Sequence, residues 1–280
     1  MRTPITSATI FPLAVLFRSF YKNRMLIFQL TKREIISRYR GSFLGILWTI
    51  INPILILAIY TFVFGFVFKV RLDQSSSSEN DQFSFALLLF SGLIVYNIFS
   101  DCLSRSPGLV LANINYVKKI IFPLDILPWV NLGATLFHAA ISLLVFLIAL
   151  LLIKHSIYWT VIWIPVILTP FLLLTLGISW FLAATGVFVR DIGQFIGLAL
   201  TMLLFLSPVF YPASALPESI RDYLFLNPLS FIIEQLRAVA LYGQLPDWQG
   251  LAIYTLIGLI FAQIGFVWFE KTRKGFADVL

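Results

Sequence analysis

Long apolar stretches dominate this sequence and decide what the chain can fold into. A helix that crosses a bilayer needs about 20 mostly apolar residues. Six stretches meet that need: Phe43–Phe68, Phe83–Ser100, Trp129–Ile153, Ile157–Val189, Ile192–Phe210 and Leu251–Phe269. Hydrophobic residues make up 60% of the 280 residues and charged residues only 12%, so a water-soluble domain of this size could not hide the apolar surface. We therefore predict an all-α integral membrane protein with six transmembrane helices.

The basic residues are distributed unevenly among the segments that connect these stretches. If both termini are cytoplasmic, 15 of the 20 Lys and Arg residues fall on the cytoplasmic side. Cytoplasmic loops of membrane proteins carry such an excess. An even number of spans also places both ends of the chain on one side, so the sequence predicts a multi-pass protein with both termini cytoplasmic.

The N-terminal region differs from the rest of the chain in its charge. Residues 1–42 are basic, and Arg24–Arg40 predicts an amphipathic helix whose cations face the anionic inner leaflet. We expect this helix to lie at the cytoplasmic membrane interface. Residues 43–280 then form the six-span transmembrane domain.

The segment between the last two stretches contains two short apolar pieces. The first piece, Pro217–Phe225, begins at Pro217, and the second, Leu229–Leu241, directly follows Pro228. Neither is long enough to cross a bilayer. We predict two short external helices, re-entrant or interfacial, between spans five and six.

Catalytic, metal-binding and ATP-binding patterns are absent from the sequence. It contains neither H-E-x-x-H nor G-x-S-x-G, and one Cys with two His residues cannot form a Cys/His ligand set. It lacks the G-x-x-x-x-G-K-[ST] phosphate loop, and its spans hold almost none of the ionisable residues that ion-coupled transport needs. We predict no enzymatic activity, no metal, no cofactor and no nucleic-acid partner for this chain. Any ATP and Mg²⁺ that drive transport would be bound by a partner subunit.

Two stripes of residues recur at helical spacing within the spans. The last span carries small residues that indicate helix–helix contact, namely Thr255, Gly258, Ala262 and Gly265. The third span carries polar residues on one face, namely Asn131, Thr135, His138 and Ser142. These polar residues either form one wall of a conduit or hydrogen-bond neighbouring helices, and we favour the second interpretation.

Aromatic residues are the positive signal in the composition, with 28 Phe, 7 Trp and 10 Tyr. Aromatic faces pack on the apolar faces of sugar rings, although Trp and Tyr near span ends more often anchor a helix at the membrane interface. The candidate conduit residues are Trp48, Asn52, Tyr60, Phe210 and Tyr211.

Several blocks, in order along nearly the whole chain, resemble a known family. The segment Thr31–Ile54, TKREIISRYRGSFLGILWTIINPI, resembles the opening of ABC-2 type permeases that export polysaccharides. The segment Asn113–Pro128, NINYVKKIIFPLDILP, resembles the cytoplasmic coupling segment of that family. Val189–Gln194, Leu206–Pro212 and Asn227–Ser230 resemble its blocks around span five and the external helices. The likeness is greatest to the O-antigen lipopolysaccharide exporter permeases, and capsule and teichoic acid permeases share the same plan.

The resemblance implies a homodimer in the bacterial inner membrane, with each subunit docked on a separate ATP-binding cassette subunit. The implied substrate is a polysaccharide linked to undecaprenyl diphosphate, and the conduit would lie between the two subunits, nearest spans one and five. The implied coupling residues are Asn113, Asn115, Tyr116, Val117, Lys118, Lys119, Ile120 and Ile121. The implied interface-helix residues are Arg33, Arg38, Tyr39 and Arg40. A membrane-embedded transferase acting on a lipid-linked sugar is the alternative from another class, and it would need an acid or histidine cluster that the sequence lacks.

Overall fold

Every regular element is a helix in the part of the chain that the computed structural model describes, which is residues 12–67, 80–117, 122–212, 217, 219, 224 and 227–280. The α-helices are α1 (Pro12–Arg38), α2 (Trp48–Tyr60), α3 (Asn80–Arg105), α4 (Ile114–Val117), α5 (Leu127–Lys154), α6 (Ile164–Phe188), α7 (Ile192–Leu206), α9 (Ser230–Leu241), α10 (Trp248–Thr272) and α11 (Phe276–Val279). A π-helical stretch, Thr61–Val67, continues α2. The all-α prediction is confirmed.

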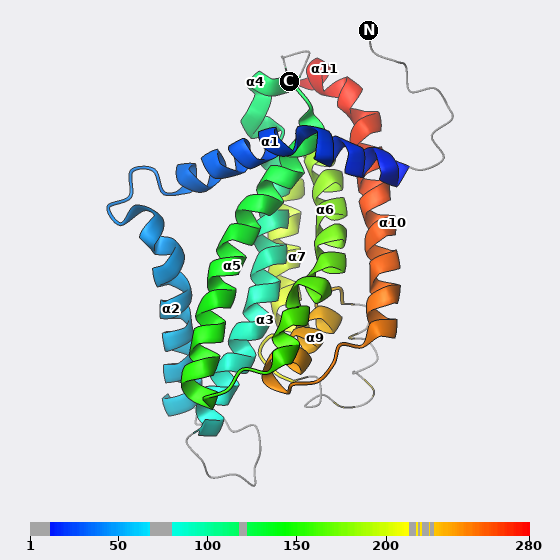
Figure 1. The fold of residues 1–280 in the computed structure, drawn as a ribbon. Helices are drawn as coiled ribbons and strands as arrows, with labels where there is room; N and C mark the ends of the chain where they lie inside the picture. The colour runs from blue at the N-terminus through cyan, green and yellow to red at the C-terminus, as the bar shows by residue number, and fades with distance from the viewer. Residues whose placement is uncertain are drawn as a thin grey trace.

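The long helices stand side by side, and the short ones lie at their ends. In Figure 1, α3, α5, α6, α7 and α10 form a bundle, with α2 along one flank. Helix α1 crosses one end of the bundle, and α4, α11 and the C-terminus lie at that same end. Helix α9 lies at the opposite end.

Among the described residues, five helical stretches are long and apolar enough to cross a membrane, by length and composition. They are Gly45–Phe64, Phe83–Gly108, Leu124–Lys154, Trp159–Phe188 and Trp248–Val279. The expected fifth span, Ile192–Phe210, is a shorter helix. With 15 residues, α7 covers about 22 Å of a hydrocarbon core of about 30 Å. It ends because Ser207 is extended, with φ −90° and ψ 153°, a conformation that the following Pro208 favours.

One of the two expected external helices falls within the described residues. Helix α9, Ser230–Leu241, agrees with the predicted piece Leu229–Leu241 to one residue. Its apolar face is fully buried in the protein at Ile232, Ile233 and Leu236. The other expected piece, Pro217–Phe225, lies mostly outside the described residues.

Helices α6 and α10 approach each other closely because glycines stand at their crossing. A Cβ atom on Gly258 would lie 2.6 Å from the Pro170 carbonyl oxygen. A Cβ atom on Gly265 would collide with the Gly177 backbone, and one on Gly177 would collide with the backbone at Phe261. The small-residue stripe of the last span therefore makes the helix–helix contact that its spacing predicted.

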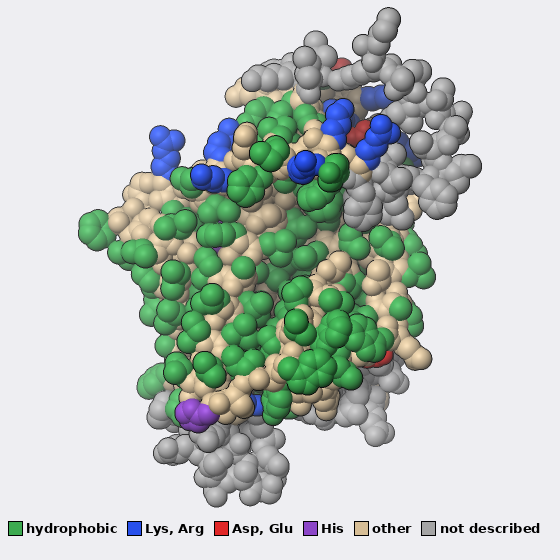
Figure 2. All heavy atoms as spheres, viewed as in Figure 1, with side chains coloured by type: hydrophobic (Ala, Val, Ile, Leu, Met, Phe, Trp, Pro, Cys, Tyr) green, Lys and Arg blue, Asp and Glu red, His purple; other side chains and the backbone are tan. Residues whose placement is uncertain are grey.

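Helix α1 packs on the bundle through buried Ile27, which contacts Ile126 and Val130, with Leu26 and Leu30 partly buried beside it. Other apolar residues of α1 stay exposed, among them Met25 and Phe28. Figure 2 shows hydrophobic side chains covering the flank of the bundle, with Lys and Arg side chains gathered at the end where α1 lies. The molecule thus has an apolar flank and one cationic end.

Candidate functional site

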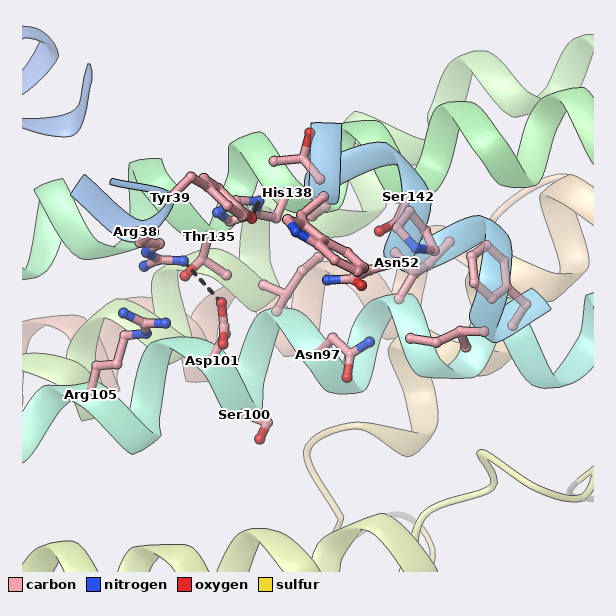
Figure 3. Close-up of a pocket in the computed structure, with 18 residues that line it drawn as sticks. Arg38, Tyr39, Asn52, Asn97, Ser100, Asp101, Arg105, Thr135, His138 and Ser142 are labelled. Atoms are coloured by element: carbon pink, nitrogen blue, oxygen red, sulfur yellow. Dashed lines mark hydrogen bonds and ion pairs between the residues drawn. The ribbon is translucent and has the colours of Figure 1, made fainter. Parts of the chain in front are cut away.

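A polar cavity of about 420 Å³ lies beneath the C-terminal end of α1. Its walls come from four parts of the chain: the end of α1, the start of α2, the second half of α3 and the middle of α5. Figure 3 shows polar side chains from these elements directed toward the same space. Polar cavities are unusual between apolar spans, where ionisable and polar residues commonly mark a functional site.

Arg38 and two carboxylates form the charged part of the cavity region. The Arg38 side chain is 10% exposed, and its Nη1 lies 3.3 Å from Asp101 Oδ2. Its Nε lies 3.6 Å from Glu34 Oε1, and Arg105 Nη1 lies 3.9 Å from the same Glu34 oxygen. Because a buried guanidinium needs counter-charges, this network explains how Arg38 can turn toward the bundle rather than toward lipid.

Tyr39 and His138 join the end of α1 to α5. The Tyr39 hydroxyl oxygen lies 3.4 Å from His138 Nδ1, and the two rings meet edge to face. Burial raises the pKa of the Tyr39 hydroxyl, partly opposed by the nearby Arg38 cation. The phenol therefore keeps its proton at any physiological pH, and this contact stays one between a neutral hydroxyl and an imidazole.

The two interpretations of the polar stripe in α5 each hold for part of it. Asn131 Nδ2 donates to the Cys102 carbonyl oxygen of α3 at 2.9 Å, which is the interhelical hydrogen bond that we favoured. Thr135, His138 and Ser142 instead line the cavity. The stripe thus binds α5 to α3 at its start and forms a polar wall further along.

The structure brings two of the five candidate conduit residues together and leaves three outside the cavity. Trp48 and Asn52, on adjacent turns of α2, both line it. Tyr60 lies about two turns beyond Asn52 along α2, with its ring centroid 6.0 Å from that of Phe64. Phe210 lies after α7 against Phe205, and the Tyr211 hydroxyl donates to the Phe205 carbonyl oxygen at 3.3 Å.

The four expected interface-helix residues divide into two pairs. Arg38 and Tyr39 turn into the cavity, unlike the leaflet-facing cations that the sequence predicted. Arg40 is exposed, and so is Arg33, whose guanidinium carbon lies 5.9 Å from the centroid of the Tyr116 ring.

The expected coupling segment is partly described. Asn113 Nδ2 donates to the Leu109 carbonyl oxygen at 2.9 Å, and Asn115 is exposed. The Tyr116 ring stacks on Phe122, with centroids 4.2 Å apart and planes 10° apart. Val117 ends α4, while Lys118, Lys119, Ile120 and Ile121 lie outside the described residues.

A second cavity, of about 360 Å³, joins the coupling segment to α1. Arg33 and Glu34 of α1 line it together with Asn113 and Tyr116. The interface helix and the coupling segment, which were predicted as separate features, therefore lie side by side.

Sequence reasoning missed Arg237 in α9, the most deeply buried charged residue in the described part of the chain. Its side chain is 1% exposed and lies 3.1 Å from the Glu234 carboxylate. It donates to the carbonyl oxygens of Leu88, Val209 and Tyr211 at 3.1, 3.0 and 3.3 Å. One signal was available: Arg237 follows Ile233 and Leu236 on the apolar face of its helix, where a cation needs buried acceptors.

The apolar helical bundle and its lateral polar cavity define an integral membrane protein of the transport class. Comparison with known proteins agrees, because residues 25–241 match the ABC-2 type transporter family. The O-antigen export system permease protein RfbA of Myxococcus xanthus is 29% identical over 265 residues, 94% of this chain and 98% of that protein. The protein of the same name from Klebsiella pneumoniae is 28% identical over 259 residues, 91% of this chain and 95% of that protein.

A third relative carries another name. The polysialic acid transport protein KpsM of Escherichia coli is 26% identical over 246 residues, 86% of this chain and 92% of that protein. The family match spans well over half of the sequence. This chain therefore belongs to the ABC-2 type transporter family, as the motifs indicated, and it is a transport subunit rather than an enzyme.

Proposed function

We propose that this chain is the permease subunit of an ATP-driven exporter that moves O-antigen polysaccharide, linked to undecaprenyl diphosphate, across the bacterial inner membrane. The cavity carries this proposal, because it offers neutral polar groups and an aromatic ring at the flank of an apolar bundle. The relatives named as O-antigen permeases support the substrate, and they align over more than nine-tenths of this chain. Export of a capsule polysaccharide is the second candidate, favoured by the relative from E. coli.

The proposed orientation places α1, α4 and α11 in the cytoplasm, with six crossings of the membrane. The cationic end of the molecule supports it, because positive charge accumulates on the cytoplasmic side of membrane proteins (Figure 2). In this arrangement α7 and the following segment Ser207–Pro212 together make the fifth crossing. Exposed Met25 and Phe28 would enter the inner leaflet, while Arg33 and Arg40 meet its headgroups.

The working unit in this proposal is a homodimer with the conduit between its subunits. Two helices support it by leaving large apolar side chains uncovered in the single chain. On α2 these include Ile54 and Ile59, and on α7 they include Phe195 and Phe205. A second copy would cover part of both surfaces, and lipid would cover the rest.

A separate ATP-binding subunit would supply the energy through the coupling segment Asn113–Ile121. Two observations support this arrangement. The sequence lacks a phosphate loop, and α4 lies beyond the cationic end of the bundle (Figure 1). Motion at α4 would reach the first cavity through α1, which contacts Tyr116 by Arg33 and Asp101 by Arg38.

Deletion of the gene tests the proposal directly. The deletion strain should lose O-antigen from its surface and accumulate undecaprenyl-linked polysaccharide inside the cell, and expression of the chain should restore export. Loss of capsule with intact O-antigen would select the second candidate. Unchanged amounts of both surface polymers would contradict the proposed function.

A further inference from the structure

The cavity beneath α1 contains buried polar atoms with unused hydrogen-bonding capacity. Arg38 Nη2, Thr135 Oγ1 and His138 Nε2 are buried and have no hydrogen-bond partner within the described part of the chain. All three side chains line the cavity, and Thr135 is only 2% exposed. Buried polar atoms in proteins nearly always have partners. Three such atoms on one cavity indicate a space that a polar ligand completes.

The charges around the cavity indicate that this ligand is neutral. Arg38 and Arg105 are balanced by Glu34 and Asp101, which lie within 3.9 Å of them. No net positive charge therefore remains among these four groups to attract a phosphate. What they offer is a fixed set of donors and acceptors, and a hydroxyl group can use both kinds.

The remaining walls fit a ring with apolar C–H faces and hydroxylated edges. Trp48 and Tyr39 contribute aromatic surface, which packs well against apolar C–H groups. Asn52 and Asn97 line the cavity and are exposed, although both belong to apolar spans. An amide facing hydrocarbon would be left without partners, so its place here indicates contact with water or with hydroxyl groups.

The size and position of the cavity further limit which ligands can bind there. Small-molecule sites occupy about 300–1,000 Å³, and this cavity, at about 420 Å³, has room for one sugar ring rather than a length of polymer. The cavity lies beside α2, which runs along one flank of the bundle, and near the cationic end. The lipid tail could therefore stay in the bilayer and the diphosphate at the headgroups, while the attached sugar enters.

We propose that this cavity binds one neutral sugar residue of the lipid-linked polysaccharide, the one nearest the lipid, within a single subunit. The proposal rests on the proposed function and adds a recognition site separate from any conduit between subunits. Arg38, Thr135 and His138 hydrogen-bond the hydroxyl groups, Trp48 packs on the ring, and Asn52 and Asn97 bind at the opening. The site selects the substrate before the polymer moves.

Photoaffinity labelling of the purified full-length chain in lipid nanodiscs tests this site without measuring transport. The probe is dodecyl β-D-glucoside with a diazirine on the sugar, and the labelled peptides are mapped by mass spectrometry. Labels should fall on the start of α2, the middle of α5 and the second half of α3. Unlabelled dodecyl glycosides should compete, whereas dodecyl phosphate should not. Equal competition by dodecyl phosphate, or labels spread evenly over the exposed spans, would overturn the proposal.

Matched variants separate hydrogen bonding from packing. Thr135→Val keeps the shape of the side chain, removes its hydroxyl, and should weaken competition by dodecyl glucoside about tenfold, the effect of one lost buried hydrogen bond. Asn97→Leu should weaken it similarly. Thr175→Val is the control, because Thr175 is equally buried but its hydroxyl donates to the Phe171 carbonyl oxygen of α6 at 2.8 Å. If dodecyl glucoside competes as well in Thr135→Val and Asn97→Leu as in the unaltered protein, the sugar does not bind in this cavity.

The labelling result and the deletion result can fail independently. If deletion abolishes surface polysaccharide but labelling shows no preference for glycosides, export stands and the sugar site is wrong. If labelling is specific for glycosides but deletion leaves surface polysaccharides unchanged, the sugar site is supported and the assignment to polysaccharide export is wrong.

Discussion

The pair α6–α10 and the helix α2 represent opposite ways of building a span. Helices α6 and α10 meet backbone to backbone at Gly177 and Gly265. By contrast, only 11% of the most apolar part of Gly45–Phe64 is buried in the chain. The tightly packed pair has no room to rearrange, while α2 contacts its own subunit along one side and borders the polar cavity there. The candidate site thus borders a helix that is held less firmly than the pair α6–α10, where local motion is easier.

The sequence of α2 contributes to this looseness. Pro53 lies inside the helix, so one backbone hydrogen bond of its ladder cannot form. The helix then continues into the π-helical stretch Thr61–Val67, a form that is rare and is found frequently at functional sites. A span with two irregularities and few contacts is suited to move against the rigid pair α6–α10.

The largest expected effect is on stability, from filling the tight contact. Gly265→Leu should lower the free energy of unfolding by about 3 kcal/mol, because the new side chain forces α10 away from α6. The midpoint of thermal unfolding in detergent measures the change. Gly197→Leu is the matched control in α7, since a Cβ atom there meets nothing within 4 Å. Equal midpoints for the two variants would show that the α6–α10 contact is not tight.

A smaller loss of stability is expected on the loose side. Arg38→Gln removes the cation between Asp101 and Glu34, which are about 40% exposed, so we expect a loss of about 1 kcal/mol after allowing for solvent screening. Export per complex should fall as well, because the end of α1 no longer closes the cavity. Arg40→Gln, at an exposed position two residues after Arg38, should alter the free energy of unfolding by less than about 0.5 kcal/mol. Similar export in both variants would indicate that Arg38 faces the lipid, as the sequence predicted, and does not close the cavity.

The link between the ATPase and the loose side should depend on Tyr116. Tyr116→Ala removes the ring that stacks on Phe122, a contact of about 0.5–1.5 kcal/mol, and the surface that Arg33 covers. We expect ATP hydrolysis by the assembled complex to persist while export declines. The ratio of polymer exported to ATP hydrolysed is the measurement. An unchanged ratio with normal assembly would exclude α4 as the route of coupling.

The smallest effects are expected from aromatic residues outside the cavity. Tyr60→Ala and Tyr211→Ala should leave export per folded complex close to that of the unaltered protein, because neither residue lines the cavity. Asn52→Leu, on the same helix as Tyr60, should reduce it clearly. If Tyr60→Ala proves as damaging as Asn52→Leu, the polymer contacts α2 along its whole length and not at the cavity alone.

Regular spacing made much of the fold predictable. The stripe Gly258, Ala262 and Gly265 and the apolar face of α9 depend on residues three or four apart, and such patterns determine which side of a helix is buried. The proline after Ser207 explains the end of α7, although span five was predicted to continue to Phe210. The charge pattern predicted the interface helix, and family resemblance supplied the coupling segment.

The cavity could not be predicted because it depends on partners far apart in the sequence. Arg38 looks like every other cation of residues 24–40, and only its contact with Asp101, 63 residues away, turns it inward. Local spacing grouped Trp48 and Asn52 with Tyr60, yet the approach of α1 and α3 encloses only the first two. The polar stripe of α5 had two reasonable interpretations for the same reason, since its neighbours were unknown.

Arg237 also bears on the order in which the protein assembles. A guanidinium leaves water readily only when acceptors are in place, and those of Arg237 lie in α3 and in the turn after α7. We therefore expect α3 and α7 to be in place before α9 can settle at the end of the bundle opposite α1. In a chain halted before that step, Arg237 would remain in water and would mark the unfinished protein.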